Sequence, residues 1–89
     1  MDHARVRTDW QQRGFSCALW TDPPGQVWAD FVHPFDELLV LVEGEIDLTV
    51  SGRTWRPAPD EEVLIPAGVA HTVRNVGGTT SRWLYGYHI

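Results

Sequence analysis

Short apolar segments separated by turn-forming residues follow one another along the whole chain. Glycine, proline and aspartate gather at the breaks, for example in Asp22-Pro23-Pro24-Gly25 and in Pro66-Ala67-Gly68. The segments between the breaks are rich in β-branched and aromatic residues, and they are Phe15–Trp20, Val27–Val32, Leu38–Val42, Ile46–Val50, Thr54–Arg56, Val63–Ile65, His71–Asn75 and Arg82–Tyr87. Short strands at this spacing predict an all-β sandwich or barrel of antiparallel strands.

The order of apolar and polar positions within the segments also indicates strands. Over residues 46–50 the apolar side chains fall on one face and the polar side chains on the other. Trp83, Tyr85 and Tyr87 likewise share one face of the last segment. Helical signals are weak, and residues 1–12 could hold one loose turn. We therefore expect little or no helix.

The length of the chain limits its domain organisation. Eighty-nine residues give room for one domain. We expect a single domain over residues 1–89, in which residues 1–12 are a loose N-terminal segment. Closure of the sheet, or a partner chain, would help so short a chain to bury enough apolar surface.

Charge and composition exclude several classes of partner. The chain has 7 basic residues, all arginine, against 12 acidic ones, for a net charge of −5. An acidic chain without a basic run is poorly suited to phosphate backbones or anionic lipids, so we expect neither nucleic acid nor membrane as a partner. The longest apolar run, Leu38–Val42, is far shorter than the ~20 residues of a membrane helix. The N-terminus has no apolar signal core and Cys17 is the single cysteine, which favours a cytoplasmic location.

Three side chains stand out as candidate metal ligands, namely His33, Glu37 and His71. His33 and Glu37 are four residues apart, so on an extended chain both would point to the same side. His71 follows the tight turn that Pro66-Ala67-Gly68 predicts. Two imidazoles and one carboxylate form a facial set that suits Fe(II) and also Mn, Ni or Zn. The identity of the ion stays open at this point.

The residues around these candidates resemble the two motifs of the cupin family. His33-Pro34-Phe35-Asp36-Glu37, followed six residues later by Gly44, resembles the second half of the first motif, G-x5-H-x-H-x3,4-E-x6-G. Residues 66–75 fit the second motif, G-x5-P-x-G-x2-H-x3-N, from its proline onward. The resemblance runs from about Trp28 to Asn75 and implies a small antiparallel jelly-roll barrel.

The sequence also departs from the cupin motifs. Phe31 stands where the first motif has its first histidine, so the carried-over metal site is His33, Glu37 and His71 without a fourth protein ligand. The resemblance therefore implies a divalent metal ion, with the alternative that the metal is absent because of Phe31. Asp60 replaces the glycine that opens the second motif, and aspartate also tolerates such turns.

Aromatic residues near the candidate ligands could line a pocket. We expect this of Phe31, Tyr85, Trp83 and Trp28, with packing in the core as the alternative, which we favour for the two tryptophans. The sequence names no catalytic residue. It contains neither a nucleophile-elbow serine nor a glycine-rich phosphate loop, which excludes serine acyl transfer and nucleotide-dependent chemistry.

Two functions from different classes follow. The first is a metal-dependent enzyme, such as a dioxygenase- or isomerase-like cupin, that acts on a small organic molecule. The second is a metal-free, non-catalytic cupin that binds or senses a small ligand. In either case we expect a homodimer, formed through residues near Phe15–Trp20, because pairing would bury the remaining apolar surface.

Overall fold

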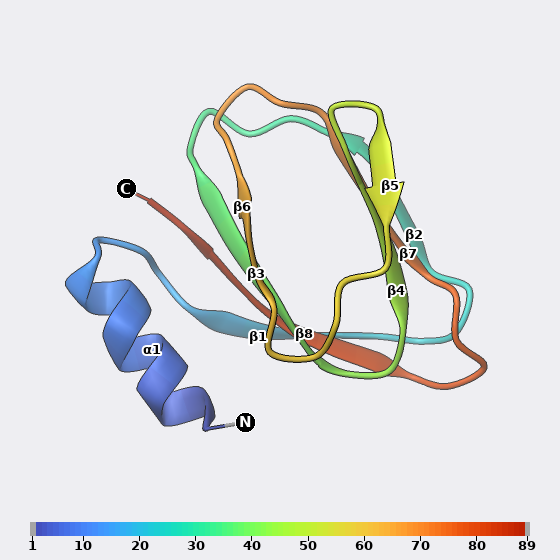
Figure 1. The fold of residues 1–89 in the computed structure, drawn as a ribbon, viewed down its shortest axis with the longest axis horizontal. Coiled ribbons are helices and arrows are strands. Elements are labelled where there is room, and N and C mark those ends of the chain that lie inside the picture. The colour runs from blue at the N-terminus through green and yellow to red at the C-terminus, as the bar shows by residue number, and fades with distance from the viewer. Residues whose placement is uncertain (1, 89) are drawn as a thin grey trace.

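The computed structural model describes residues 2–88, which form one helix and eight strands (Figure 1). In chain order the elements are α1 (His3–Gln12), β1 (Ala18–Asp22), β2 (Val27–Phe31), β3 (Glu37–Glu43), β4 (Ile46–Val50), β5 (Arg53–Trp55), β6 (Glu62–Ile65), β7 (His71–Asn75) and β8 (Ser81–Tyr87). Each apolar segment of the sequence overlaps a strand. The first overlap is partial, since β1 begins at Ala18 rather than at Phe15.

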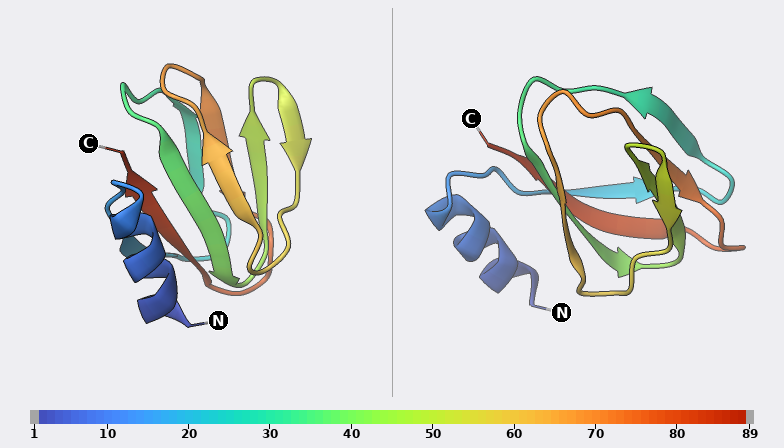
Figure 2. Two further views of the ribbon diagram at one scale, coloured as in Figure 1. Left: turned by 60° about the vertical axis from the view of Figure 1, so that its left-hand side comes forward. Right: turned by 45° about the horizontal axis from the view of Figure 1, so that its top comes forward.

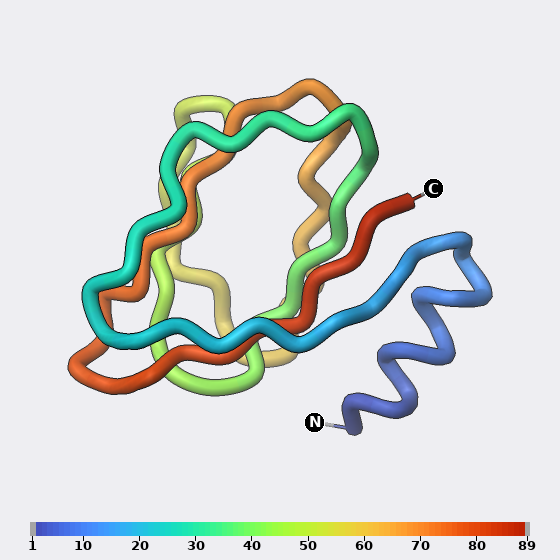
Figure 3. Tube along the Cα trace, turned by 180° about the vertical axis from the view of Figure 1, so that it is seen from behind, coloured from blue at the N-terminus to red at the C-terminus, as the bar shows by residue number. Residues whose placement is uncertain are grey.

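The strands form two antiparallel sheets that face each other. The first sheet has the order β1-β8-β3-β6 and the second the order β2-β7-β4-β5. Viewed from behind, β1 runs alongside β8, so the two ends of the strand sequence lie next to each other (Figure 3). The expected antiparallel jelly roll is confirmed. The sheets do not close into one continuous barrel, however, because β1 and β6 are edges of the first sheet and β2 and β5 are edges of the second within residues 2–88.

The main core lies between the two sheets. Its eight apolar side chains are each at most 6% exposed, and they are Leu39, Leu41, Ile46, Leu48, Val63, Ile65, Val73 and Trp83. Burial of such side chains is the dominant favourable term in folding. Ile46 and Leu48 are two residues apart on β4 and both point inward, as the alternating pattern predicts. Because both sheets contribute to this core, it fixes how their inner faces oppose each other.

Helix α1 packs on the outer face of the first sheet and was not expected from the sequence (Figure 2). It spans ten residues where we predicted at most one loose turn. Its Trp10 is 1% exposed and packs with Leu38, Val40 and Leu84 in a second core cluster. Strand β3 is therefore buried on both faces. Among residues 2–88, no helix has the length and apolar character that crossing a membrane requires.

Polar contacts cap α1 and attach it to the first sheet. The side chain of Asp2 accepts a hydrogen bond from the backbone N–H of Arg5 (3.2 Å) and so caps the helix. Glu62, on β6, accepts hydrogen bonds from the indole of Trp10 (2.9 Å) and from both terminal nitrogens of Arg13 (2.9 and 3.0 Å). The Arg13 guanidinium lowers the pKa of Glu62. The contacts of Glu62 attach α1 and the residue after it to β6, an edge strand of the first sheet.

Two turns explain why particular residues stand at the motif positions. Gly44 has φ +86°, and a Cβ atom there would lie 2.8 Å from the carbonyl oxygen of Thr80 and from Cα of Ser81. Only glycine fits such a position without a shift of the backbone. Asp60 has φ +69°, so the aspartate adopts the left-handed conformation that glycine would otherwise provide.

Candidate metal centre

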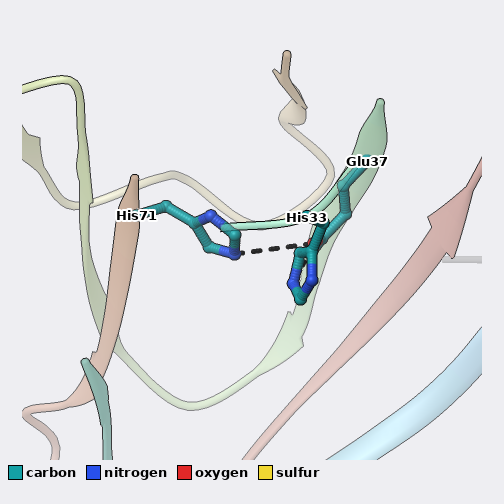
Figure 4. Close-up of side chains that lie close together, drawn as sticks. All are labelled: His33, Glu37 and His71. Carbon is teal, nitrogen blue, oxygen red and sulfur yellow. Dashed lines mark ion pairs between the residues drawn. The ribbon is translucent and has the colours of Figure 1, made fainter. Parts of the chain in front are cut away.

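The structure brings the side chains of His33, Glu37 and His71 together at one end of the space between the sheets. Nε2 of His33 lies 3.5 Å from Oε1 of Glu37, and Nε2 of His71 lies 3.6 Å from the same oxygen. One ligand atom from each residue lies within 4.8 Å of the others. Figure 4 shows the three side chains converging from the β2–β3 loop, from β3 and from β7.

His33 reaches this cluster through loop contacts rather than along a strand. We expected His33 and Glu37 to share a side of an extended chain, but β2 ends at Phe31 and His33 lies in the loop before β3. The backbone N–H of Gly68 donates to the carbonyl oxygen of His33 (2.8 Å), and that of Ala67 donates to Oδ1 of Asp36 (2.8 Å). These bonds join the β2–β3 loop to the β6–β7 turn, which fixes His33 near His71.

Burial shifts the pKa values of Glu37 and His71. Glu37 is 5% exposed, and desolvation raises the pKa of its carboxyl group to about 7. Desolvation also lowers the pKa of His71, which is 5% exposed. Nδ1 of His71 faces the carbonyl oxygen of Val69 at 3.4 Å. This contact favours the tautomer that carries its proton on Nδ1 and leaves Nε2 free to bind a metal.

The three residues fit a divalent metal ion. Oε1 of Glu37 is buried and has no hydrogen-bond partner in the described part of the chain, which is costly for a polar atom. Two atoms that bind one ion at ~2.0–2.2 Å each lie about 3–3.5 Å apart. The separations of 3.5 and 3.6 Å between this oxygen and the two Nε2 atoms are close to that spacing.

Phe31 occupies the place beside the histidines where the cupin motif has a further ligand. Its ring stacks on His33, with centroids 5.9 Å apart and planes at 14°, and it lies 6.2 Å from the ring of His71. The pairing register of β2 with β7 shifts between Trp28 and Phe31, where Asp30 has φ +57°. The nearby carboxylates of Asp30 and Asp36 are both outside the cluster of candidate ligands.

A cavity of about 210 Å³ adjoins the cluster. Its lining comes from both sheets and consists of Trp20, Trp28, Phe31, His33, Glu37, Leu39, His71, Val73, Trp83, Tyr85 and Tyr87. Phe31, Trp28, Trp83 and Tyr85 are therefore all at its surface, while Trp83 is also part of the core. Trp20 also lines the cavity, although it was not one of the four residues expected there. Only the pairing of Trp20 with Trp83 across β1 and β8 places it there.

Tyr87 adds a hydroxyl group to the polar end of the cavity. Its oxygen lies 3.4 Å from Nε2 of His33. Burial, together with the nearby charge of Glu37, raises the pKa of Tyr87 to about 12. The phenol therefore keeps its proton near neutral pH and can donate a hydrogen bond. Its face on β8 was predicted from the alternation, but its closeness to His33 depends on the loop before β3.

Comparison with known proteins identifies the family of this fold. The family described as "Cupin domain" matches residues 18–87. Polyketide synthase CurC of Streptomyces cyaneus is 30% identical over 63 residues, which are 70% of this chain and 41% of that protein. The chain thus spans less than half the length of this relative.

Solved structures share the fold. The polyketide cyclase RemF from Streptomyces resistomycificus has a TM-score of 0.72 and 25% identity, over 82% of this chain and 53% of that one. The Cnp3 cupin domain of Schizosaccharomyces pombe has a TM-score of 0.77 and 21% identity, over 84% and 56% of the two chains. With the two facing sheets and the match over residues 18–87, these likenesses show that the chain belongs to the cupin family.

Proposed function

We propose that this cupin holds a divalent metal ion, one of Fe, Mn, Ni or Zn, between His33, Glu37 and His71, and that it acts on or binds a small organic molecule in the adjoining cavity. The observation that carries the proposal is the buried Oε1 of Glu37, which has no hydrogen-bond partner in residues 2–88 and lies between two imidazole Nε2 atoms. A cation there would compensate the buried carboxylate and use both imidazoles.

The residues around the cluster would bind and orient such a molecule. A divalent ion at this site would supply a Lewis acid for an oxygen atom of the ligand. The protonated hydroxyl of Tyr87, 3.4 Å from His33, can donate a hydrogen bond to a second ligand oxygen. The aromatic lining keeps water away from the body of the ligand and strengthens these polar contacts.

The relatives support a finer proposal for the ligand. One is named as a polyketide synthase and another as a polyketide cyclase, and each matches more than two thirds of this chain. We propose that the ligand is a polyketide or a similar compound with several carbonyl oxygens. For an enzyme, an isomerase-like reaction that moves protons within the substrate fits this class, because a metal ion that polarises a carbonyl oxygen stabilises the negative charge left when a neighbouring proton is removed. A dioxygenase-like reaction is the alternative.

A metal-free, non-catalytic cupin that binds or senses a small ligand is the second candidate. Phe31 favours this candidate, because it stands where the cupin motif has a further metal ligand and its ring stacks on His33. In this case the two histidines and Tyr87 would serve as hydrogen-bonding groups for the ligand.

Elemental analysis of protein purified without a histidine tag separates the two candidates. We expect about one metal ion per chain in the wild type, much less in His33→Ala and His71→Ala, and the full amount in His3→Ala. His3 lies exposed on α1, so this variant controls for the loss of an imidazole elsewhere. Absence of metal after Fe, Mn, Ni or Zn is supplied to the wild type would contradict the metal centre and support the second candidate.

Two expectations from the sequence stay predictions. The first is a homodimer formed near Phe15–Trp20, where Leu19 is 48% exposed on the edge strand β1. The second is a cytoplasmic location.

A further inference from the structure

Six aromatic rings form a closed collar around the cavity. In order around the collar they are Trp20, Trp28, Phe31, His33, Tyr87 and Tyr85. Successive ring centroids are 5.7, 5.9, 5.9, 5.0 and 5.9 Å apart, and Tyr85 returns to Trp20 at 6.1 Å. These separations are typical of favourable edge-to-face and offset aromatic pairs. The collar joins rings from β1 and β8 of the first sheet to rings from β2 of the second.

A buried carboxylate holds two rings of this collar. Asp22, the last residue of β1, is 2% exposed. Its Oδ1 accepts a hydrogen bond from the indole N–H of Trp20 (2.8 Å), and its Oδ2 accepts one from the indole N–H of Trp28 (2.7 Å). Each carboxylate oxygen thus accepts a hydrogen bond from one tryptophan, and the two tryptophans belong to different sheets. Hydrogen bonds to a charged acceptor are stronger than neutral ones, so this pair fixes both ring orientations.

This arrangement makes one side of the cavity apolar and leaves the other side polar. Both indole N–H groups are used by Asp22, so Trp20 and Trp28 offer ring carbon atoms to a ligand. The polar groups of His33, Glu37 and His71 gather at the other side. At about 210 Å³, the cavity is smaller than the ~300–1,000 Å³ of sites for drug-sized ligands, which limits the enclosed part of a ligand to one or two rings.

We propose that Asp22 is a positioning residue that fixes Trp20 and Trp28 as a ring-binding wall, and that the cavity takes a flat aromatic ring whose oxygen substituent points toward His33, Glu37 and His71. The oxygen end of this proposal rests on the proposed metal centre. The ring wall does not, because it depends only on the contacts of Asp22.

The test compares ligands that share a carboxylate and differ in the ring. Protein loaded with Zn²⁺ is titrated with acetate, cyclohexanecarboxylate and benzoate, and the dissociation constants are measured by calorimetry. We expect benzoate to bind about three- to tenfold more tightly than cyclohexanecarboxylate, which is the size of an aromatic pair. In Asp22→Asn the amide nitrogen cannot accept a hydrogen bond, so one indole loses its partner. The ratio should then fall to about twofold or less, while acetate binding stays unchanged.

Asp47→Asn is the matched control, because Asp47 bonds Arg56 on the exposed side of β4 and does not line the cavity. It should keep the wild-type ratio. A folded Asp22→Asn with an unchanged ratio, or a wild type without ring preference, would overturn the role of Asp22. Should Asp22→Asn fail to fold, Trp20→Phe removes one donor but keeps an aromatic ring, and the same fall in the ratio is required of it.

The acetate titration distinguishes failure of this inference from failure of the metal centre. If acetate binding does not depend on Zn²⁺, the proposed metal centre is wrong. The ring wall is then tested in metal-free protein with two uncharged ligands, benzyl alcohol and cyclohexylmethanol. Their affinities are measured from changes in the NMR signals of the indole N–H groups. A preference for benzyl alcohol that Asp22→Asn removes supports the wall, and equal affinities overturn it.

Discussion

Glu37 is the side chain on which the chemistry of the site depends most. A carboxylate that is 5% exposed, with one oxygen lacking a hydrogen-bond partner among residues 2–88, destabilises a folded protein unless a cation or a proton compensates it. The pKa of about 7 expresses this, because burial favours the neutral acid. A metal ion would take over the role of the proton.

We therefore predict an unusual pH dependence for the metal-free protein. The pKa of Glu37 rises from 4.5 to about 7 on folding, so the folded state holds the proton more tightly between these values. The stability that protonated Glu37 gives to the folded state is fully present below pH 4.5, and it is lost as the pH rises through 7. The total loss in the free energy of unfolding is no more than about 3 kcal/mol. Glu37→Gln does not titrate, so in a chelator it should gain stability relative to the wild type from pH 5 to pH 8.

Urea unfolding of both proteins at the two pH values measures this difference. The lowered pKa of His71 has the opposite effect, because it increases stability as the pH rises toward 6.5, but it acts in both proteins. A difference between wild type and Glu37→Gln that does not change with pH would show that Glu37 is not desolvated as described.

Phe31 allows a test in which a metal ligand is added instead of removed. Its ring lies beside both histidines, so Phe31→His would place a third imidazole next to the proposed ion. We expect zinc affinity to rise by about tenfold or more, since a further ligand need contribute only ~1.4 kcal/mol for that factor. Phe35→His, in the loop that follows β2 and outside the cavity lining, is the control and should leave the affinity unchanged. Equal affinities in all three proteins would contradict the assigned place of Phe31.

The sequence predicted some of these side chains and missed others for a physical reason. His33, Glu37 and His71 were found because their spacing matches a motif. The face of Tyr87 on the last strand was also predicted, but its closeness to His33, and the place of Trp20 at the cavity, depend on a loop conformation and on strand pairing, which a single sequence does not determine. The two hydrogen bonds of Asp22 join tryptophans of different sheets, and the sequence alone could not predict them either.

Strands were predicted better than the helix. Apolar alternation and frequent turns identified the strands, and the bounds of β4 and β7 agree with the prediction. Helix α1 has few apolar residues, so its own sequence gives a weak signal. A second signal was present in the unbroken apolar run Leu38–Val42. Such a run is typical of a strand buried on both faces, and α1 covers the outer face of this one.

The packing of α1 gives a stability prediction. Trp10 is 1% exposed and covers Leu38, Val40 and Leu84. We expect Trp10→Ala to lower the free energy of unfolding by about 3–5 kcal/mol, as for other buried aromatic side chains. Circular dichroism and urea unfolding measure the loss. A loss below about 1 kcal/mol would fit a loosely attached N-terminal segment and contradict the packing of α1.

The chain as a unit leaves an edge strand and apolar side chains exposed. Within the segment expected to form the dimer, Phe15 packs under α1 while Leu19 is 48% exposed. We predict a dimer whose dissociation constant rises at least about tenfold in Leu19→Arg, because an arginine charge is costly in an apolar interface. Leu64→Arg, on the opposite edge strand β6, is the control. Sedimentation velocity at micromolar concentration measures the mass, and a wild type with the mass of one chain would contradict the prediction.

The most decisive experiment locates the metal directly. A crystal grown with zinc is measured at wavelengths on both sides of the zinc absorption edge. We expect one anomalous difference peak about 2.0–2.2 Å from Nε2 of His33, Nε2 of His71 and Oε1 of Glu37, the usual zinc–ligand distances. No peak at this position, or a zinc peak bound only elsewhere on the chain, would contradict the metal centre.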